Sequence, residues 1–132
     1  MRLLLDTSAY SGFMRGNLKI KTYIQEAEII SVNAVVLGEL RAGFLHGKKR
    51  EKNEELLRRF LLSPRTHVLP VEEETADRYA VIMNALWTLG KPIPTNDIWI
   101  AATAMQFGLE ILTMDVHFQY VPQVLVHHIT SE

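Results

Sequence analysis

Short apolar runs alternate with helix-like segments along this chain, and that order constrains the fold more than any other feature of the sequence. The first run, Arg2–Leu5, does not alternate apolar with polar side chains, which suits a strand buried on both faces. Strands that alternate with helices form βα units, and their strands pair in parallel. We therefore expect an α/β fold with a mainly parallel central sheet of about five strands.

Capping and turn residues indicate where these elements begin and end. The run Asp6-Thr7-Ser8 ends the first strand and can start a helix, and Asn33 is a plausible N-cap. The expected strands are 2–5, 28–32, 66–71, 110–113 and 124–129, the last of them at an edge of the sheet. The expected helices are 19–27, 34–45, 54–62, 72–89 and a final helix to residue 107 that Thr95 or Asn96 caps.

The composition limits the class of protein. A chain of 132 residues, 48% of them hydrophobic, fits one domain with a real core, and we expect residues 1–132 to form a single domain. The absence of cysteine excludes disulfides, thiolate zinc sites and a cysteine nucleophile. No apolar run is long enough to span a bilayer, and no secretory signal is recognisable. We therefore expect a cytoplasmic protein with no membrane partner.

Four acidic residues fall at the seams between the expected strands and helices. Asp6 and Asp115 follow strands, Asp97 opens a helix, and Glu39 lies on an apolar helix. A parallel sheet brings such seams together at its carboxyl edge, where ligands bind. Crowded carboxylates repel one another, and a hard divalent cation with oxygen ligands relieves that repulsion. The pattern therefore predicts a Mg²⁺ or Mn²⁺ site and indicates metal-dependent phosphodiester chemistry.

Each of these acids also has a common structural explanation when it is taken alone. Asp6 and Asp115 are typical cap or turn residues, and Glu39 is equally well explained as an exposed helix acid. Asp97 in a first helical turn favours the helix dipole. The functional interpretation depends on all four together, because only a parallel sheet brings seams from both ends of the chain to one edge.

Four stretches of the sequence together resemble the PIN domain, and within it the VapC-type toxins of bacterial and archaeal toxin–antitoxin pairs. They are residues 3–8 (LLLDTS), 31–40 (SVNAVVLGEL), 93–104 (IPTNDIWIAATA) and 112–118 (LTMDVHF). The third stretch is the most specific, and the order and spacing cover essentially the whole chain. The resemblance implies a compact, three-layer α/β/α nuclease that cuts RNA with Mg²⁺ or Mn²⁺.

The resemblance also implies roles for individual residues. The family's acidic positions match four residues, Asp6, Glu39, Asp97 and Asp115. Thr7 or Ser8 matches the hydroxyl position after the first acid, and Thr113 matches the one before the last. Many relatives carry an acid just before the phenylalanine of the fourth stretch, where this chain has His117. Asp115 is therefore expected to be the fourth acid.

Metal-assisted hydrolysis of RNA gives these residues chemical roles. We expect Asp6 and Asp97 to be the core metal ligands. Asp115 would complete the site directly or through water, and Glu39 would hold a metal-bound water or a second ion. The residues expected to orient these carboxylates and waters are Thr7, Ser8, Thr113 and Asn96.

The formal net charge of the chain is -1, so any positive charge that contacts RNA must come from a small group of residues rather than from the whole surface. Arg15 is the preferred candidate for a phosphate contact, since it follows soon after Asp6, and His117 is a second candidate. The basic cluster at residues 48–52 and the pair at 58–59 are better explained as solvated faces.

Partners follow from the resemblance, since family members are often homodimers and are neutralised by a small antitoxin protein whose tail fills the acidic groove. We expect the same partners here, with Trp87 and Phe44 as candidates for an apolar patch.

The serious alternative is a catalytically weak or inactive PIN-like scaffold that binds RNA or a protein partner. Two other classes of protein fit the sequence poorly. A haloacid-dehalogenase-type phosphatase needs a second aspartate where this chain has Ser8, and a receiver domain needs an acidic pair after its first strand, which this chain lacks.

Overall fold

The computed structural model describes residues 1–130 and has a five-stranded sheet whose strands all run parallel. The order across the sheet is β3-β2-β1-β4-β5, which places the first strand in the middle and the last at an edge. The strands are β1 (Arg2–Leu5), β2 (Ile29–Asn33), β3 (Thr66–Leu69), β4 (Glu110–Thr113) and β5 (Val126–His128). The expected parallel α/β sheet is confirmed.

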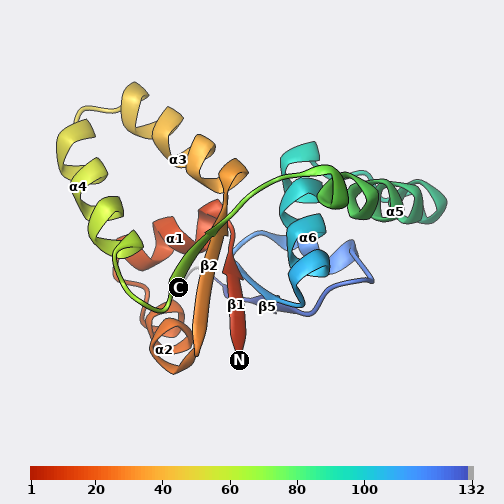
Figure 1. Cartoon of the computed structure of the whole chain (residues 1–132), viewed down its shortest axis with the longest axis horizontal. Coiled ribbons are helices and arrows are strands. Elements are labelled where there is room, and N and C mark those ends of the chain that lie inside the picture. The colour runs from red at the N-terminus through yellow and green to blue at the C-terminus, as the bar shows by residue number, and fades with distance from the viewer. Residues whose placement is uncertain (131–132) are drawn as a thin grey trace.

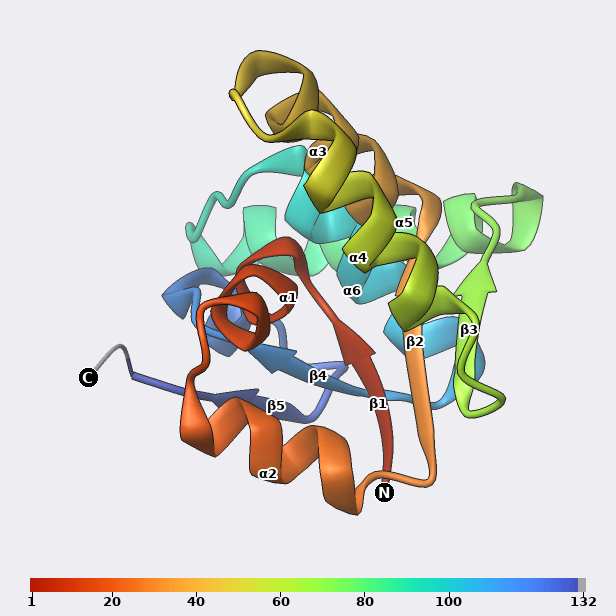
Figure 2. The ribbon, with the colours of Figure 1, turned by 90° about the vertical axis from the view of Figure 1, so that its left-hand side faces the viewer.

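Helices cover both faces of this sheet and give the expected three layers (Figure 1). The helices are α1 (Thr7–Met14), α2 (Leu18–Glu26), α3 (Ala34–His46), α4 (Arg50–Leu61), α5 (Glu73–Leu89), α6 (Thr95–Phe107) and a 3₁₀ helix, η1 (Val116–Tyr120). α1, α2 and α4 lie on one side of the sheet, and α5 and α6 lie on the other (Figure 2). α3 and α4 form a hairpin that extends beyond the carboxyl edge (Figure 1). Within the described residues, none of these helices has the length and apolar character to cross a membrane.

The middle strand, β1, is buried on both faces, as its lack of alternation predicts. Leu3, Leu4 and Leu5 have no exposed surface. β1 pairs with β2 on one side and β4 on the other, and helices cover both of its faces. Burying each leucine stabilises the fold by about 1.5–3 kcal/mol relative to exposure. The strand therefore gives a rigid base to Asp6, the residue that follows it.

α1 was not among the expected helices, although the run Asp6-Thr7-Ser8 was recognised as a possible helix start. Its N-cap is Asp6, whose carboxylate accepts a hydrogen bond from the backbone nitrogen of Ala9. Gly12 allows a close approach to the rest of the fold, because a Cβ at this position would lie 2.7 Å from Ile20 Cδ1 and 2.7 Å from Met114 Sδ. The cap and this tertiary packing, rather than an apolar periodicity, explain the helix.

Other boundaries differ from the expected ones by a few residues. α4 begins at Arg50, earlier than expected. The sequence pattern missed its first turn, because the residues there are polar and largely exposed and so carry no apolar period. The expected capping of α6 by Thr95 or Asn96 is wrong. Pro94 is the N-cap, and its carbonyl accepts a hydrogen bond from the backbone nitrogen of Asp97 at 3.1 Å. β3 and β5 are shorter than expected, and η1 was not expected at all.

The tryptophans have different surroundings. Trp99 on α6 stacks against Tyr79 on α5, with 4.2 Å between the ring centroids, so it packs within the protein. Trp87 on α5 is 71% exposed, whereas Phe44 is partly buried against the core. Trp87 therefore remains the candidate for an apolar contact, and Phe44 contributes less surface than expected.

Candidate metal centre

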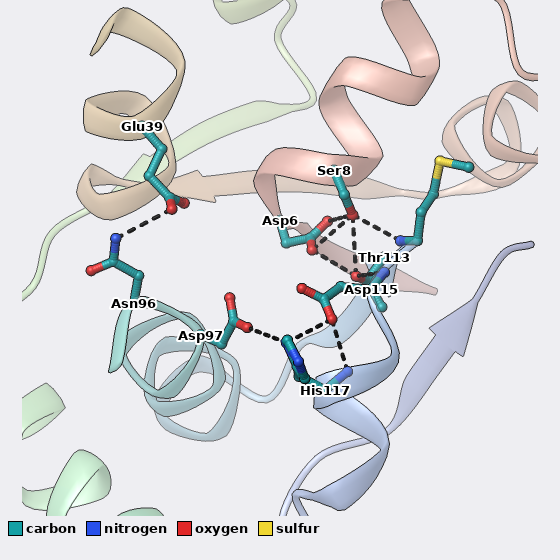
Figure 3. Close-up of polar contacts among 9 residues, drawn as sticks. Asp6, Ser8, Glu39, Asn96, Asp97, Thr113, Asp115 and His117 are labelled. Carbon is teal, nitrogen blue, oxygen red and sulfur yellow. Dashed lines mark hydrogen bonds and ion pairs between the residues drawn. The ribbon is translucent and has the colours of Figure 1, made fainter. Parts of the chain in front are cut away.

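The carboxyl edge of the sheet brings three of the four predicted acids into one site (Figure 3). Asp6 follows β1 directly, and Asp115 lies two residues after the neighbouring strand β4. Asp97 stands in the first turn of α6. The fourth acid, Glu39, projects from α3 and lies apart from the others. Strand order, which sequence alone did not give, explains why acids more than 100 positions apart meet.

Asp6 is 3% exposed, and four hydrogen bonds hold its carboxylate. Oδ1 accepts from Ser8 Oγ and from the backbone nitrogen of Ala9, both at 2.8 Å. Oδ2 accepts from Thr113 Oγ1 at 2.6 Å and from Ser8 Oγ at 2.9 Å. Burial raises the pKa of Asp6, and the hydrogen bonds from Thr113, Ala9 and Ser8 oppose that rise. The carboxylate is thus fixed in position in a place that disfavours negative charge.

Asp97, Asp115 and His117 form a cluster whose potential ligand atoms all lie within 4.8 Å of one another. His117 Nδ1 lies 3.2 Å from Asp97 Oδ2 and 2.9 Å from Asp115 Oδ1 (Figure 3). Burial raises the pKa of Asp97 to about 6, the charges of Asp115 and Asp6 add to the rise, and the contact with His117 opposes it. This part of the site therefore disfavours negative charge on Asp97 as long as no cation is nearby.

Glu39 has its own set of partners. Thr7 Oγ1 donates a hydrogen bond to Glu39 Oε1 at 2.6 Å, and Asn96 Nδ2 donates one to Glu39 Oε2 at 3.2 Å. A buried contact holds α3 against α6 nearby, where Asn33 Nδ2 donates to Thr103 Oγ1 at 3.0 Å. These contacts fix Glu39 and Asp97 relative to each other through their helices, although the two carboxylates do not share a cluster.

The donor set suits a divalent cation. Among the ion pairs of residues 1–130, no lysine or arginine balances Asp6, Asp97 or Asp115, since the paired arginines contact other acids. Hard divalent ions take carboxylate oxygens as ligands, and an imidazole nitrogen is a ligand of transition ions. The cluster of Asp97, Asp115 and His117 therefore has the chemistry to hold a metal ion, with the carboxyl group of Asp6 beside it (Figure 3).

The small polar residues predicted to orient the acids all donate a hydrogen bond to one of them. Thr7 and Asn96 contact Glu39, and Ser8 and Thr113 contact Asp6. The backbone nitrogen of Asp115 in turn donates to Thr113 Oγ1 at 2.8 Å. One hydroxyl thus links the acids that follow β1 and β4, and the catalytic roles of these residues remain predictions.

Two features of the site were missed by sequence reasoning. His117 was predicted only as an RNA contact, yet its ring nitrogen faces two acids. Its position two residues after Asp115 could have placed it near the site. The 3₁₀ turn η1, which directs the ring toward the acids, could not be predicted from the sequence. The buried pair of Asn33 and Thr103 was also missed, because Asn33 was predicted only as an N-cap and its partner 70 positions away depends on how α6 packs.

Comparisons with known proteins agree with this fold. Residues 3–124 match the model of the PIN domain. Ribonuclease VapC4 from Mycobacterium tuberculosis is 33% identical over 125 residues, which cover 95% of each chain. Toxin FitB from Neisseria gonorrhoeae is 33% identical over 132 residues, which cover 94% of this chain and 95% of FitB. The crystal structure of FitAcB from the same organism aligns with a TM-score of 0.79 at 31% identity, covering 94% of this chain and 95% of that one.

This chain belongs to the PIN domain family, because the family model covers most of its length. Its relatives include proteins named ribonuclease VapC and toxin FitB. The resemblance drawn from the four sequence stretches is therefore confirmed, and so is the three-layer fold that it implied.

Proposed function

We propose that this protein is an endoribonuclease that hydrolyses RNA phosphodiester bonds with Mg²⁺ or Mn²⁺ and acts as the toxin of a toxin–antitoxin pair. The observation that carries the proposal is the cluster of Asp97, Asp115 and His117 beside Asp6 at the carboxyl edge of a PIN-domain sheet. Relatives named as a ribonuclease and as a toxin support it. We also propose that residues 1–132 form a single PIN domain.

Hydrolysis of a phosphodiester needs an oriented water and a neutralised phosphate charge. Asp97 and Asp115 would hold a cation at the site, with Asp6 fixed beside them by hydroxyl groups of α1 and β4. A bound divalent ion polarises a phosphoryl oxygen and lowers the pKa of its water. Glu39, held from two sides by hydrogen bonds, would orient the attacking water or bind a second ion.

The proposed partners are RNA, a small antitoxin protein and a second copy of this chain. The relative named Toxin FitB supports the toxin role, and the antitoxin follows from that role. The exposed Trp87 on α5 is a candidate for contact between two copies. Dimerisation and a cytoplasmic location remain predictions.

Purified protein should cut total cellular RNA into discrete fragments when Mg²⁺ or Mn²⁺ is present. EDTA should abolish the cleavage, because the acids of the site would then have no cation to neutralise phosphate charge. Gel electrophoresis of the RNA with each ion and with EDTA measures the effect. Cleavage that persists in EDTA would contradict the proposal. A folded, antitoxin-free sample that binds RNA without cutting it would favour the scaffold alternative.

Arg15 is proposed to contact an RNA phosphate near the site. It is exposed at the end of α1, with Nη2 4.0 Å from the sulfur of Met114, the neighbour of Asp115. Arg15→Gln should weaken RNA binding about three- to tenfold and lower the slope of log Kd against log salt concentration by about one. Fluorescence anisotropy in an Asp97→Asn background, which prevents cleavage, gives both values.

Lys21→Gln is the matched control for Arg15, because it removes one exposed positive charge from α2. It should leave the salt dependence unchanged. Equal effects of the two substitutions would show that general charge, rather than a local phosphate contact, explains the result.

A further inference from the structure

A single imidazole nitrogen faces two carboxylates that come from different parts of the chain. His117 Nδ1 lies 2.9 Å from Asp115 Oδ1 and 3.2 Å from Asp97 Oδ2. Asp97 belongs to α6, whereas Asp115 and His117 belong to the segment after β4. The ring nitrogen Nδ1 therefore lies where the two acids converge.

The three potential donor atoms are close enough together to contact one ion. Nδ1 lies within contact distance of both carboxylate oxygens, and all three donor atoms lie within 4.8 Å of one another. A cation could therefore replace the direct contacts of the ring with small shifts of the side chains.

The backbone around His117 is held in place by hydrogen bonds. Its backbone nitrogen donates to Asp115 Oδ1 at 2.9 Å, which caps η1. The backbone nitrogen of Asp115 donates to Thr113 Oγ1 at the end of β4. Phe118, the next residue, is fully buried and anchors the segment in the core. The ring is thus presented to the two acids by a fixed segment.

We propose that Nδ1 of His117 is a direct ligand of the divalent ion and that it makes the site prefer Mn²⁺ to Mg²⁺. The inference rests on the proposed function, since that function requires a divalent ion at this site. Mg²⁺ takes oxygen ligands, whereas imidazole nitrogen suits first-row transition ions. Of the two ions that the acids predict, Mn²⁺ is the transition ion. His117 Nδ1 is therefore assigned to the metal and not to RNA.

Pulsed electron paramagnetic resonance of the Mn²⁺-bound protein tests the ligand directly. A nitrogen bonded to Mn²⁺ gives a ¹⁴N modulation of the electron spin echo. We expect this modulation in the unmodified protein and its loss in His117→Gln and His117→Asp. His127→Gln is the matched control, because His127 Nε2 contacts Glu110 at 2.8 Å in a second histidine–carboxylate pair away from the site. It should keep the modulation.

Binding measurements test the preference between the two ions. Titration calorimetry should give a ratio of the Mg²⁺ to the Mn²⁺ dissociation constant that falls about tenfold in His117→Asp, which restores an all-oxygen site. Mn²⁺ binding without nitrogen coupling in the unmodified protein would overturn the assignment of His117 and leave the proposed function standing. A protein that binds Mg²⁺ but not Mn²⁺ would likewise overturn only the inference, whereas failure to bind either ion would overturn the proposed function as well, so the two failures are distinguishable.

Discussion

Asp6→Asn is expected to lower metal-dependent RNA cleavage at least about 100-fold while the protein stays folded. Loss of residues that merely support metal ligands costs about 10- to 100-fold, and Asp6 lies beside the cluster itself. The substitution replaces a carboxyl group, which a cation can bind as a carboxylate, by a neutral amide at a site where the proposed chemistry requires a cation. Initial rates of cleavage of a labelled RNA, measured at saturating Mn²⁺, give the effect.

The folded state should survive this change, because asparagine is as good an N-cap as aspartate. Its side-chain oxygen can still accept the hydrogen bond from Ala9, and the hydroxyl of Thr113 can accept a hydrogen bond from the new amide. Asp77→Asn is the matched control, since Asp77 is an exposed acid on α5. An Asp6→Asn protein with normal circular dichroism and normal activity would contradict the assigned role.

Asp97→Asn should raise the melting temperature of the metal-free protein at pH 7.5 even though it removes a site residue. The pKa of Asp97 is raised from 3.8 to about 6, so the folded protein holds a proton that the unfolded chain has released between these pH values. Stability therefore falls as pH rises through this range. Asparagine cannot ionise and avoids this loss.

The gain should be about 1–2 kcal/mol after allowance for the partial exposure of Asp97, which corresponds to about 3–8 °C for a chain of this length. Thermal unfolding in EDTA at pH 7.5 and pH 4.5 measures it, and the advantage should shrink at the lower pH. Saturating Mn²⁺ should stabilise the unmodified protein more than the variant. A variant that melts lower than the unmodified protein at pH 7.5 without metal would refute the argument.

Sequence reasoning predicted the fold where the signal was local. The apolar run Leu3-Leu4-Leu5 and the strand–helix alternation were sufficient for a parallel sheet. α1 was not fully predicted, because it depends on a cap from Asp6 and on the packing of Gly12 against distant residues. The first turn of α4 was missed because its exposed residues need no apolar pattern.

The site, like the fold, could be predicted from the sequence only where the signal was local. Acids at strand ends can be found from sequence, and Asp97 and Asp115 indeed lie in one cluster. Which acids meet depends on strand order and helix placement, so the separate position of Glu39 was not predictable. The orientation of His117 depends on η1, a turn without an apolar period, and thus became visible only in the structure.

In the proposed role as a toxin, the double role of Asp6 affects how cells could escape this protein by mutation. Asp6 caps α1 and joins the site, so most replacements there damage the fold as well as the activity. Asp97 caps nothing, and its charge costs stability. Inactivating replacements of Asp97 would therefore leave an abundant protein that can still bind the proposed antitoxin. Most inactivating replacements of Asp6 would instead leave little folded protein to bind it.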